Sequence, residues 1–195
     1  MQNLSLENIP KEIWSHLKNG IKDISSAFHF PSLSTINLDG YPTSRTVILR
    51  NIDFKKKLIS FNTDIRSQKW FEMKNNNNIL LHIYDFKNKT QLRITGKAFL
   101  NYKNKNWDNA WNSLSIMSKE CYSSPHSPSI YIENPKDIDQ NIKTIKKDCL
   151  DKYKINFGRI DVEVKIIDWL YLLHSGHRRA KFTYNKKLKM TWLAP

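Results

Sequence analysis

The feature that most constrains the fold is a series of short segments in which apolar and polar residues alternate, joined by tight turns. The clearest is RIDVEVKIIDWLYLL at residues 159–173, and strand pairs flank the turns DG at residues 39–40 and FKNK at residues 86–89. KLISFN, RRAKFTY and KMTWLAP have the same character. Strands linked mostly by hairpins, with few helices between them, indicate an antiparallel sheet. We therefore predict a mainly β protein, an antiparallel barrel of six or seven strands.

Other segments have helical periodicity. Residues 9–28 place apolar side chains on one face, and shorter helices are predicted over residues 66–76, 105–119 and 138–153. The Pro- and Ser-rich stretch between the last two is predicted to be a loop. A chain of 195 residues suits one domain, which we assign to residues 1–195 with a helical insertion at about 103–152.

The high positive charge is typical of proteins that bind nucleic acid, but its distribution along this chain does not favour such a partner. The net charge is +14, and 25 of the 32 basic residues are Lys, spread over the whole chain. The basic residues of a nucleic-acid-binding surface are clustered and include a larger share of Arg. A solvated Lys surface is the preferred interpretation, and a basic nucleic-acid-binding module remains an alternative.

Several other classes of protein are disfavoured. No apolar run is long enough to span a bilayer, and the first residues lack the pattern of a secretory signal. Cys121 and Cys149 form no CxxC pair, so we expect reduced thiols, a cytoplasmic location and no metal centre. The chain has only five glycines, and the sequence contains neither a P-loop nor a dinucleotide-binding fingerprint.

The seven residues TDIRSQK, from Thr63 to Lys69, form the most informative motif. They lie between a predicted strand and a predicted helix, where the first amides of the helix favour an anion. Ser67, Arg66 and Lys69 add a hydroxyl and two charges, and a neighbouring strand could bring Arg45 beside them. A phosphate clamp and a capped, solvated basic turn both fit this pattern.

Three motifs in order, RTVILRNID, FNTDIRSQK and TQLRITGKA, resemble the flavin-contacting segments of the pyridoxamine 5'-phosphate oxidase-like proteins. The resemblance extends from about Pro31 to the terminal WLAP, and the TDIRSQK form is similar to an uncharacterised branch of the family. It implies an FMN-binding split β-barrel that is a homodimer with the flavin at the interface.

The resemblance also implies roles for individual residues. Arg45, Ser67 and Lys69 would bind the FMN phosphate, with Arg66 nearby. The flavin ring would lie against Thr46, Val47 and Ile48 and near Asn62 and Thr63. Gln91 would contact the ring from the other subunit. Trp169 and one of Arg179 or Lys181 would make the C-terminal contacts.

The substrate-binding residues depart from the family pattern. The oxidases grip the substrate phosphate with Tyr, Arg and Ser at spacing four and four, where this chain has Ser115, Lys119 and Ser123. The family's Arg-Leu-His segment corresponds to His177, Arg178 and Arg179. We therefore assign substrate binding to Arg50, Lys119, Ser123, His177 and Arg178, and no side chain to acid–base catalysis.

The resulting hypothesis is an FMN-dependent oxidoreductase that transfers a hydride from a small molecule to flavin N5. We expect its substrate to differ from pyridoxine phosphate. The alternative on the same barrel is a non-catalytic protein that binds flavin, haem or deazaflavin.

Overall fold

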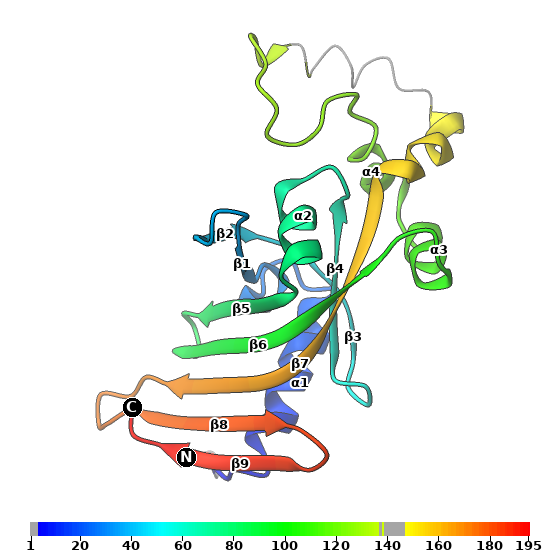
Figure 1. The fold of residues 1–195 in the computed structure, drawn as a ribbon. Coiled ribbons are helices and arrows are strands. Elements are labelled where there is room, and N and C mark those ends of the chain that lie inside the picture. Colours follow the sequence, from blue (N-terminus) through cyan, green and yellow to red (C-terminus); the bar gives the residue numbers. More distant parts are fainter. Residues whose placement is uncertain (1–3, 137, 139–146) are drawn as a thin grey trace.

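Nine antiparallel strands form a single sheet in the computed structural model, which describes residues 4–136, 138 and 147–195. The hydrogen-bonded order is β2-β1-β5-β6-β7-β4-β3, with β8 beside β7 and β9 beside β8 (Figure 1). The strands are β1 Ser32–Ile36, β2 Pro42–Thr46, β3 Leu49–Asp53, β4 Leu58–Asp64, β5 Asn78–Asp85, β6 Thr90–Asn101, β7 Phe157–Tyr171, β8 Arg178–Tyr184 and β9 Leu188–Leu193. The predicted antiparallel, mainly β fold is confirmed. The sheet curls without closing, because its path ends at β2 and β3.

The longest strand, β7, organises the sheet. One edge of β7 pairs with β6 along almost its whole length. The other edge is divided, because residues 157–163 pair with β4 and residues 166–171 pair with β8. A register shift near this division leaves Lys165 of β7 unpaired between the partners of Thr95 and Gly96, and such a β-bulge bends the strand that carries it. On this edge, the first half of β7 therefore pairs with β4 and the second half pairs with β8.

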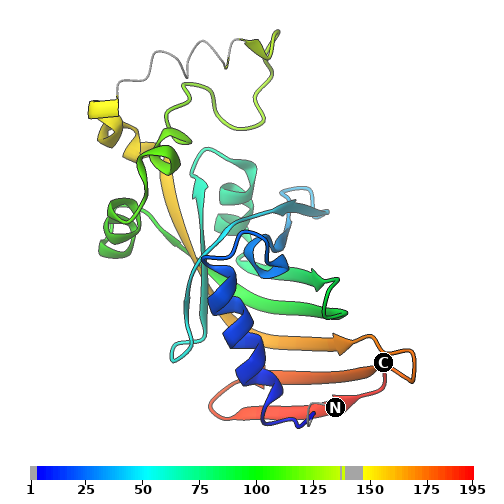
Figure 2. The ribbon, with the colours of Figure 1, turned by 180° about the vertical axis from the view of Figure 1, so that it is seen from behind.

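The helices cover the sheet and its ends. They are α1 Ile9–Gly20, η1 Ala27–His29, α2 Gln68–Asn75, α3 Lys105–Asn112, α4 Ile116–Glu120 and η2 Lys147–Asn156. Figure 2 shows α1 lying across one face of the sheet, where it buries Ile13, Trp14 and Leu17. The indole Nε1 of Trp14 donates to the hydroxyl of Tyr184 at 3.1 Å. This burial of an amphipathic face, more than helix propensity, holds α1 in place.

The predicted N-terminal helix over residues 9–28 is too long, because α1 ends at Gly20. A Cβ at Gly20 would lie 2.7 Å from the Cβ of Phe28, so this glycine allows the chain to fold back closely. The side chain of Asp23 then accepts from the N–H of Ser25 at 2.9 Å, and Ser26 caps η1. Side chains that bond to nearby backbone in this way compete with helix formation.

Two other predicted elements are divided. The strand expected after the DG turn splits into β2 and β3. Val47 still donates to the carbonyl of Pro31 in the register of the β1–β2 ladder, but Pro31 has no N–H to continue it, so the pairing ends there. This split contributes to nine strands where six or seven were predicted. The helix expected over 105–119 breaks between α3 and α4, where the side chain of Ser115 accepts from the N–H of Ser118. Half of the helix predicted over 138–153, residues 139–146, lies outside the described residues, and residues 147–153 belong to η2.

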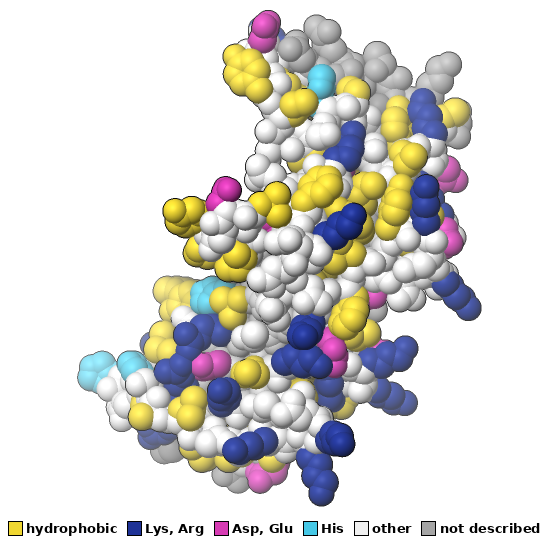
Figure 3. Space-filling view, viewed as in Figure 1, with side chains coloured by type: hydrophobic (Ala, Val, Ile, Leu, Met, Phe, Trp, Pro, Cys, Tyr) yellow, Lys and Arg dark blue, Asp and Glu magenta, His cyan; other side chains and the backbone are white. Residues whose placement is uncertain are grey.

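Charged side chains are mixed on the surface. Figure 3 shows Lys and Arg scattered over one face, with Asp and Glu between several of them. Within residues 4–136, 138 and 147–195, no helix combines the length and the hydropathy required to cross a membrane. The same residues contain no group of three or more His, Cys, Asp or Glu placed to hold a metal ion.

Candidate functional site

The segment Thr63–Lys69 turns from β4 directly into α2, and close packing fixes the turn. Thr63 pairs with Gly158 of β7, and a Cβ at Gly158 would lie 2.5 Å from the ring of Trp70. The missing side chain therefore makes the space into which α2 docks. The hydroxyls of Thr63 and Ser67 lie 3.1 Å apart, and both residues are buried. The start of α2 is thus held against the sheet with these hydroxyls on its inner side.

Arg45 reaches the same place from β2. Its Nη2 donates to Glu72 Oε2 of α2 at 2.9 Å and to Thr43 Oγ1 at 2.8 Å, while Nη1 donates to Thr35 Oγ1. Glu72 is only 4% exposed, and burial raises the pKa of its carboxyl. Hydrogen bonds from Thr35 and Thr43 and the charge of Arg45 outweigh burial, so the pKa of Glu72 is lowered overall. The ion pair is therefore fully charged at neutral pH.

Lys69 adds a second cation beside this pair. Its Nζ donates to Thr63 Oγ1 at 3.4 Å. Burial lowers the pKa of Lys69 and the nearby Arg45 lowers it further, while Asp64 and Glu72 raise it. We refer to Arg45, Thr63, Ser67, Lys69 and Glu72 as the Arg45 corner. The structure thus brings together the cations and hydroxyls that the sequence motif suggested.

Arg66 takes a different place. Its guanidinium forms a forked pair with Asp64, with Nη2 to Oδ2 at 2.6 Å and Nε to Oδ1 at 3.0 Å. Its Nη1 donates to the carbonyl of Ser124 at 3.0 Å. Arg66 therefore ties the Thr63–Lys69 turn to the Pro- and Ser-rich loop, a structural role next to the Arg45 corner.

The short link between β2 and β3 leads from the Arg45 corner along the sheet. Thr46 is exposed, Ile48 is half-buried, and Val47 is buried in the core. Asn62 of β4 follows Phe61, which pairs with Leu49 just after this link, and its Oδ1 accepts from Arg159 Nη1 at 3.3 Å.

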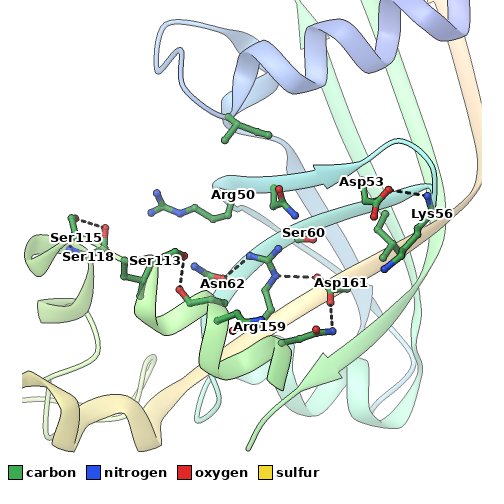
Figure 4. A pocket seen from close by; sticks show the side chains of 17 residues that line it. Arg50, Asp53, Lys56, Ser60, Asn62, Ser113, Ser115, Ser118, Arg159 and Asp161 are labelled. Atoms are coloured by element: carbon green, nitrogen blue, oxygen red, sulfur yellow. Dashed lines mark hydrogen bonds and ion pairs between the residues drawn. The ribbon is translucent and has the colours of Figure 1, made fainter. Parts of the chain in front are cut away.

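A pocket of about 690 Å³ opens between β3, β4, β7 and the α3–α4 helices (Figure 4). Arg50 reaches into it from β3, and Ser113, Ser115 and Ser118 line the opposite wall. Its floor is polar, because Arg159 bonds to Asp161 Oδ1 at 3.0 Å. Figure 4 shows these side chains turned toward one another across the floor. The pocket therefore suits a polar molecule that hydrogen-bonds.

Four of the five predicted substrate residues, Lys119, Ser123, His177 and Arg178, do not line this pocket. Lys119 Nζ contacts Asp151 Oδ1 at 3.3 Å and lies over the ring of Trp111. Ser123 is 5% exposed, and its hydroxyl donates to the carbonyl of Glu120 at 2.6 Å. Both side chains have structural partners at the end of α4, whereas Arg50 borders the open space.

A second polar cluster lies on the outer face of β6, β7 and β8. Asp168 Oδ2 accepts from Arg93 at 2.6 Å and from Arg179 Nη2 at 2.8 Å, and its Oδ1 accepts from Arg179 Nε at 3.0 Å. Burial raises the pKa of Asp168, but the bonds from Arg179 and Arg93 lower it overall. Gln91 is two residues from Arg93 and therefore points to the same face. We refer to Gln91, Arg93, Asp168 and Arg179 as the Arg179 face.

Three other predicted residues lie close to this face but are oriented differently. Trp169 is on the opposite side of β7, where it is 6% exposed and borders a smaller pocket beside α1. His177 Nδ1 accepts from the N–H of Leu173 at 3.2 Å. Arg178 Nη1 donates to the carbonyls of Gly176 and His177. These last two side chains close the β7–β8 turn.

The Arg45 corner and the Arg179 face lie at opposite ends of β7. Thr63 pairs with Gly158, whereas Gln91 and Arg179 pair with Leu170. Twelve residues of strand separate these positions, or roughly 40 Å if β7 were straight at about 3.3 Å per residue. One small molecule therefore cannot touch both clusters of a single chain.

Two residues that organise these clusters, Glu72 and Asp168, were not predicted from the sequence. Each is the only acidic residue in its stretch, QKWFEMK and KIIDWLY. A lone carboxylate in a segment that is otherwise buried or basic is the signal that could have identified them, because a buried charge needs a partner.

Comparisons with known proteins agree on one family. Residues 11–101 match the family model described as pyridoxamine 5'-phosphate oxidase, FMN-binding domain. The chain is 28% identical over 169 residues to a pyridoxine/pyridoxamine 5'-phosphate oxidase 2 of Arabidopsis thaliana, covering 82% of this chain and 83% of the relative.

Solved structures share the fold over almost the whole chain. A pyridoxamine 5'-phosphate oxidase-related, FMN-binding protein of Nostoc punctiforme PCC 73102 superposes with a TM-score of 0.77 at 18% identity, covering 95% of this chain and 97% of the other. PhzG of Burkholderia lata 383, crystallised with tetrahydrophenazine-1-carboxylic acid, gives a TM-score of 0.73 at 16% identity, covering 97% and 92%. These matches agree with the resemblance carried by the three sequence motifs: the chain is similar in sequence to the pyridoxamine 5'-phosphate oxidase-like proteins and shares their fold.

Proposed function

We propose that the protein is an FMN-dependent oxidoreductase that binds the flavin phosphate at the Arg45 corner. The observation that carries the proposal is the convergence of Arg45, Thr63, Ser67 and Lys69 from three elements onto one small volume. The match of residues 11–101 to an FMN-binding domain supports the same cofactor.

The donors at this corner fit a phosphate monoester. A guanidinium supplies directed N–H groups and an ammonium supplies a point charge. The hydroxyl of Thr63 can donate to a remaining oxygen, and that of Ser67 would do so by turning from the carbonyl of Asp64, to which it donates at 2.6 Å. α2 begins at Gln68, with Ser67 as its N-cap, and the helix dipole adds to the positive potential there. A terminal phosphate uses all of these groups, and we expect FMN to be bound in preference to FAD.

The flavin ring would follow the link between β2 and β3. Thr46, Val47 and Ile48 supply backbone groups and an apolar wall, and Asn62 and Thr63 lie on the neighbouring strand. A flavin site needs a cationic end and an apolar wall with a few donors, and this path from the Arg45 corner supplies both.

A homodimer completes this site. Gln91 and Arg179 match flavin contacts of the family, yet they lie about twelve residues of β7 away from the Arg45 corner. A flavin at the Arg45 corner of one protomer would therefore meet Gln91 and Arg179 of its partner. Asp168 would hold Arg179 in place for that contact.

FMN accepts a hydride at N5, so the chemistry of the bound cofactor is oxidation of a small molecule. The chain would bind the flavin, orient the substrate and exclude water, with the pocket beside Arg50 as the substrate site. Lys119 and Ser123 are engaged with Asp151 and Glu120, which weakens any grip on a pyridoxine phosphate. We therefore propose a polar substrate other than the vitamin B6 phosphates. The two exposed free cysteines fit a reducing, cytoplasmic setting.

The test is the absorption spectrum of the purified protein, followed by mass spectrometry of the released cofactor. We expect a flavin spectrum, the mass of FMN, and a dimer by light scattering at low micromolar concentration. Haem, a deazaflavin, FAD or no chromophore would contradict the proposal. Anaerobic bleaching of the flavin by candidate reductants then distinguishes an oxidoreductase from a non-catalytic flavin carrier.

A further inference from the structure

A buried carboxylate lies inside a site rich in positive charge. Glu72 is 4% exposed, and a single oxygen, Oε2, accepts from Thr35 at 2.5 Å, from Arg45 at 2.9 Å and from Thr43 at 3.1 Å. Burial lowers the pKa of the nearby Lys69, and the Glu72 carboxylate partly offsets that effect. Glu72 therefore serves both cations of the Arg45 corner.

This arrangement is unexpected for an anion site, because a carboxylate repels the phosphate that the cations attract. Without Glu72, Arg45 and Lys69 would place two positive charges in a partly desolvated place with no counter-ion among these residues. With Glu72, the three side chains carry a net charge of +1. Burying unpaired charges is costly, so the carboxylate stabilises the protein before any ligand arrives.

We propose that Glu72 is an internal counter-ion that takes the place of the phosphate in the ligand-free protein and thereby limits affinity for it. The inference rests on the proposed binding of FMN at the Arg45 corner. A phosphate that bonds to Arg45 has to share this guanidinium with Glu72. The phosphate and the carboxylate then lie on either side of one guanidinium and repel each other. Glu72 thus determines how strongly the site prefers a phosphorylated flavin over an unphosphorylated one.

Two effects of removing the charge oppose each other. Glu72→Gln keeps an oxygen for Arg45, Thr35 and Thr43, so much of the orientation of Arg45 is retained. It also removes the repulsion of a full charge from a phosphate that carries between one and two charges. At this short range, we expect the affinity gained by removing the repulsion between phosphate and carboxylate to exceed the affinity lost because Arg45 is held less firmly. We expect FMN to bind about tenfold more tightly, or about 1.4 kcal/mol.

The experiment measures Kd for FMN and for riboflavin with the full-length apoprotein at pH 7 and constant ionic strength. Wild type, Glu72→Gln and the control Asp85→Asn are compared by flavin fluorescence quenching. Asp85 is also a buried carboxylate, but it bonds only within the β5–β6 turn, to Lys87 and Asn88. Thermal unfolding of each apoprotein is recorded in parallel.

The expected result is a tenfold gain in FMN affinity for Glu72→Gln, an unchanged riboflavin affinity, and a Tm several degrees lower without ligand. Asp85→Asn should leave the ratio of the two affinities unchanged. If Glu72→Gln does not fold, Glu72→Asp keeps a charge but withdraws it from Arg45, and its ratio should shift in the same direction by less.

Weaker FMN binding with unchanged riboflavin binding would overturn the inference, because Glu72 would then act by orienting Arg45. Equal changes for both flavins, or none, would also overturn it. These outcomes are distinct from a failure of the proposed function, which would appear as a wild-type protein that binds FMN no better than riboflavin.

Discussion

Replacing Arg45 by Leu tests where the phosphate lies. The side chain now spans β2 to α2, with bonds to Thr35, Thr43 and Glu72. Its removal would abolish the directed contact to a phosphate and leave Glu72 buried without its cation. Two effects follow, one on binding and one on stability.

The effect on binding can be estimated from hydrogen bonds to charged groups, which contribute about 1.5–3 kcal/mol each. Loss of one or two such bonds weakens FMN binding by about 2–4 kcal/mol, or roughly 30- to 700-fold. Riboflavin has no phosphate, so its affinity should stay within about twofold, since the change corresponds to less than about 0.5 kcal/mol. Arg45→Lys keeps the charge without the planar fork and should lie between wild type and Arg45→Leu.

The effect on stability has its own control. Breaking a buried pair by removing one partner costs about 3 kcal/mol, whereas removing both partners costs much less. Arg45→Leu should therefore lower the Tm, and the double variant Arg45→Leu/Glu72→Gln should recover much of it without recovering FMN binding. Fluorescence titration and thermal unfolding measure both quantities. If Arg45→Leu bound FMN as tightly as wild type, or lost both flavins equally, the phosphate would not be at Arg45.

Three further predictions address the frame of the site, its outer face and its substrate. Gly158→Ala should lower the unfolding free energy by about 2 kcal/mol or more and weaken FMN binding, because the new Cβ would meet Trp70 and displace α2; an unchanged Tm would contradict this packing. Folding lowers the pKa of Asp168, so the ionised carboxylate stabilises the folded protein. This contribution is fully present above the unfolded pKa of about 3.9 and is lost as the pH falls through the lower pKa of the folded state. Asp168→Asn should therefore reduce the Tm at pH 7, and the difference from wild type should shrink only below about pH 4. Pyridoxine 5'-phosphate and pyridoxamine 5'-phosphate should be poor substrates in a peroxide-release assay, and turnover near 1 per second or faster, about the rate of ordinary enzymes, would return the protein to the vitamin B6 oxidases.

The sequence predicted the elements that depend on local pattern. Alternation predicted β7 and the β5–β6 hairpin, and the TDIRSQK motif predicted that Arg45 lies near Ser67 and Lys69. That these residues bind an anion stays a prediction. The end of α1 at Gly20 was missed, because it depends on a close approach to Phe28 that only the tertiary fold reveals.

The electrostatic organisation of the site could not be predicted from spacing. Glu72 is 27 residues from Arg45, and Asp168 is 75 residues from Arg93. Such pairs depend on strand register, and a shift of one residue would place every side chain on the opposite face. Lys119 and Ser123 were predicted from their alignment with substrate residues of the family. That alignment gave no information about their partners in the fold, Asp151 and Glu120.

A mixed-dimer experiment tests most directly whether one flavin is shared by two chains. One chain carries Arg45→Leu and the other carries Gln91→Ala with Arg179→Leu, so each homodimer has two damaged sites. A dimer with one chain of each kind has one intact site, built from the Arg45 corner of the second chain and the Arg179 face of the first. With differently tagged chains, we predict that this mixed dimer binds one FMN per dimer with wild-type affinity while both homodimers bind weakly. Affinity as weak in the mixed dimer as in the homodimers would contradict a flavin site shared between subunits.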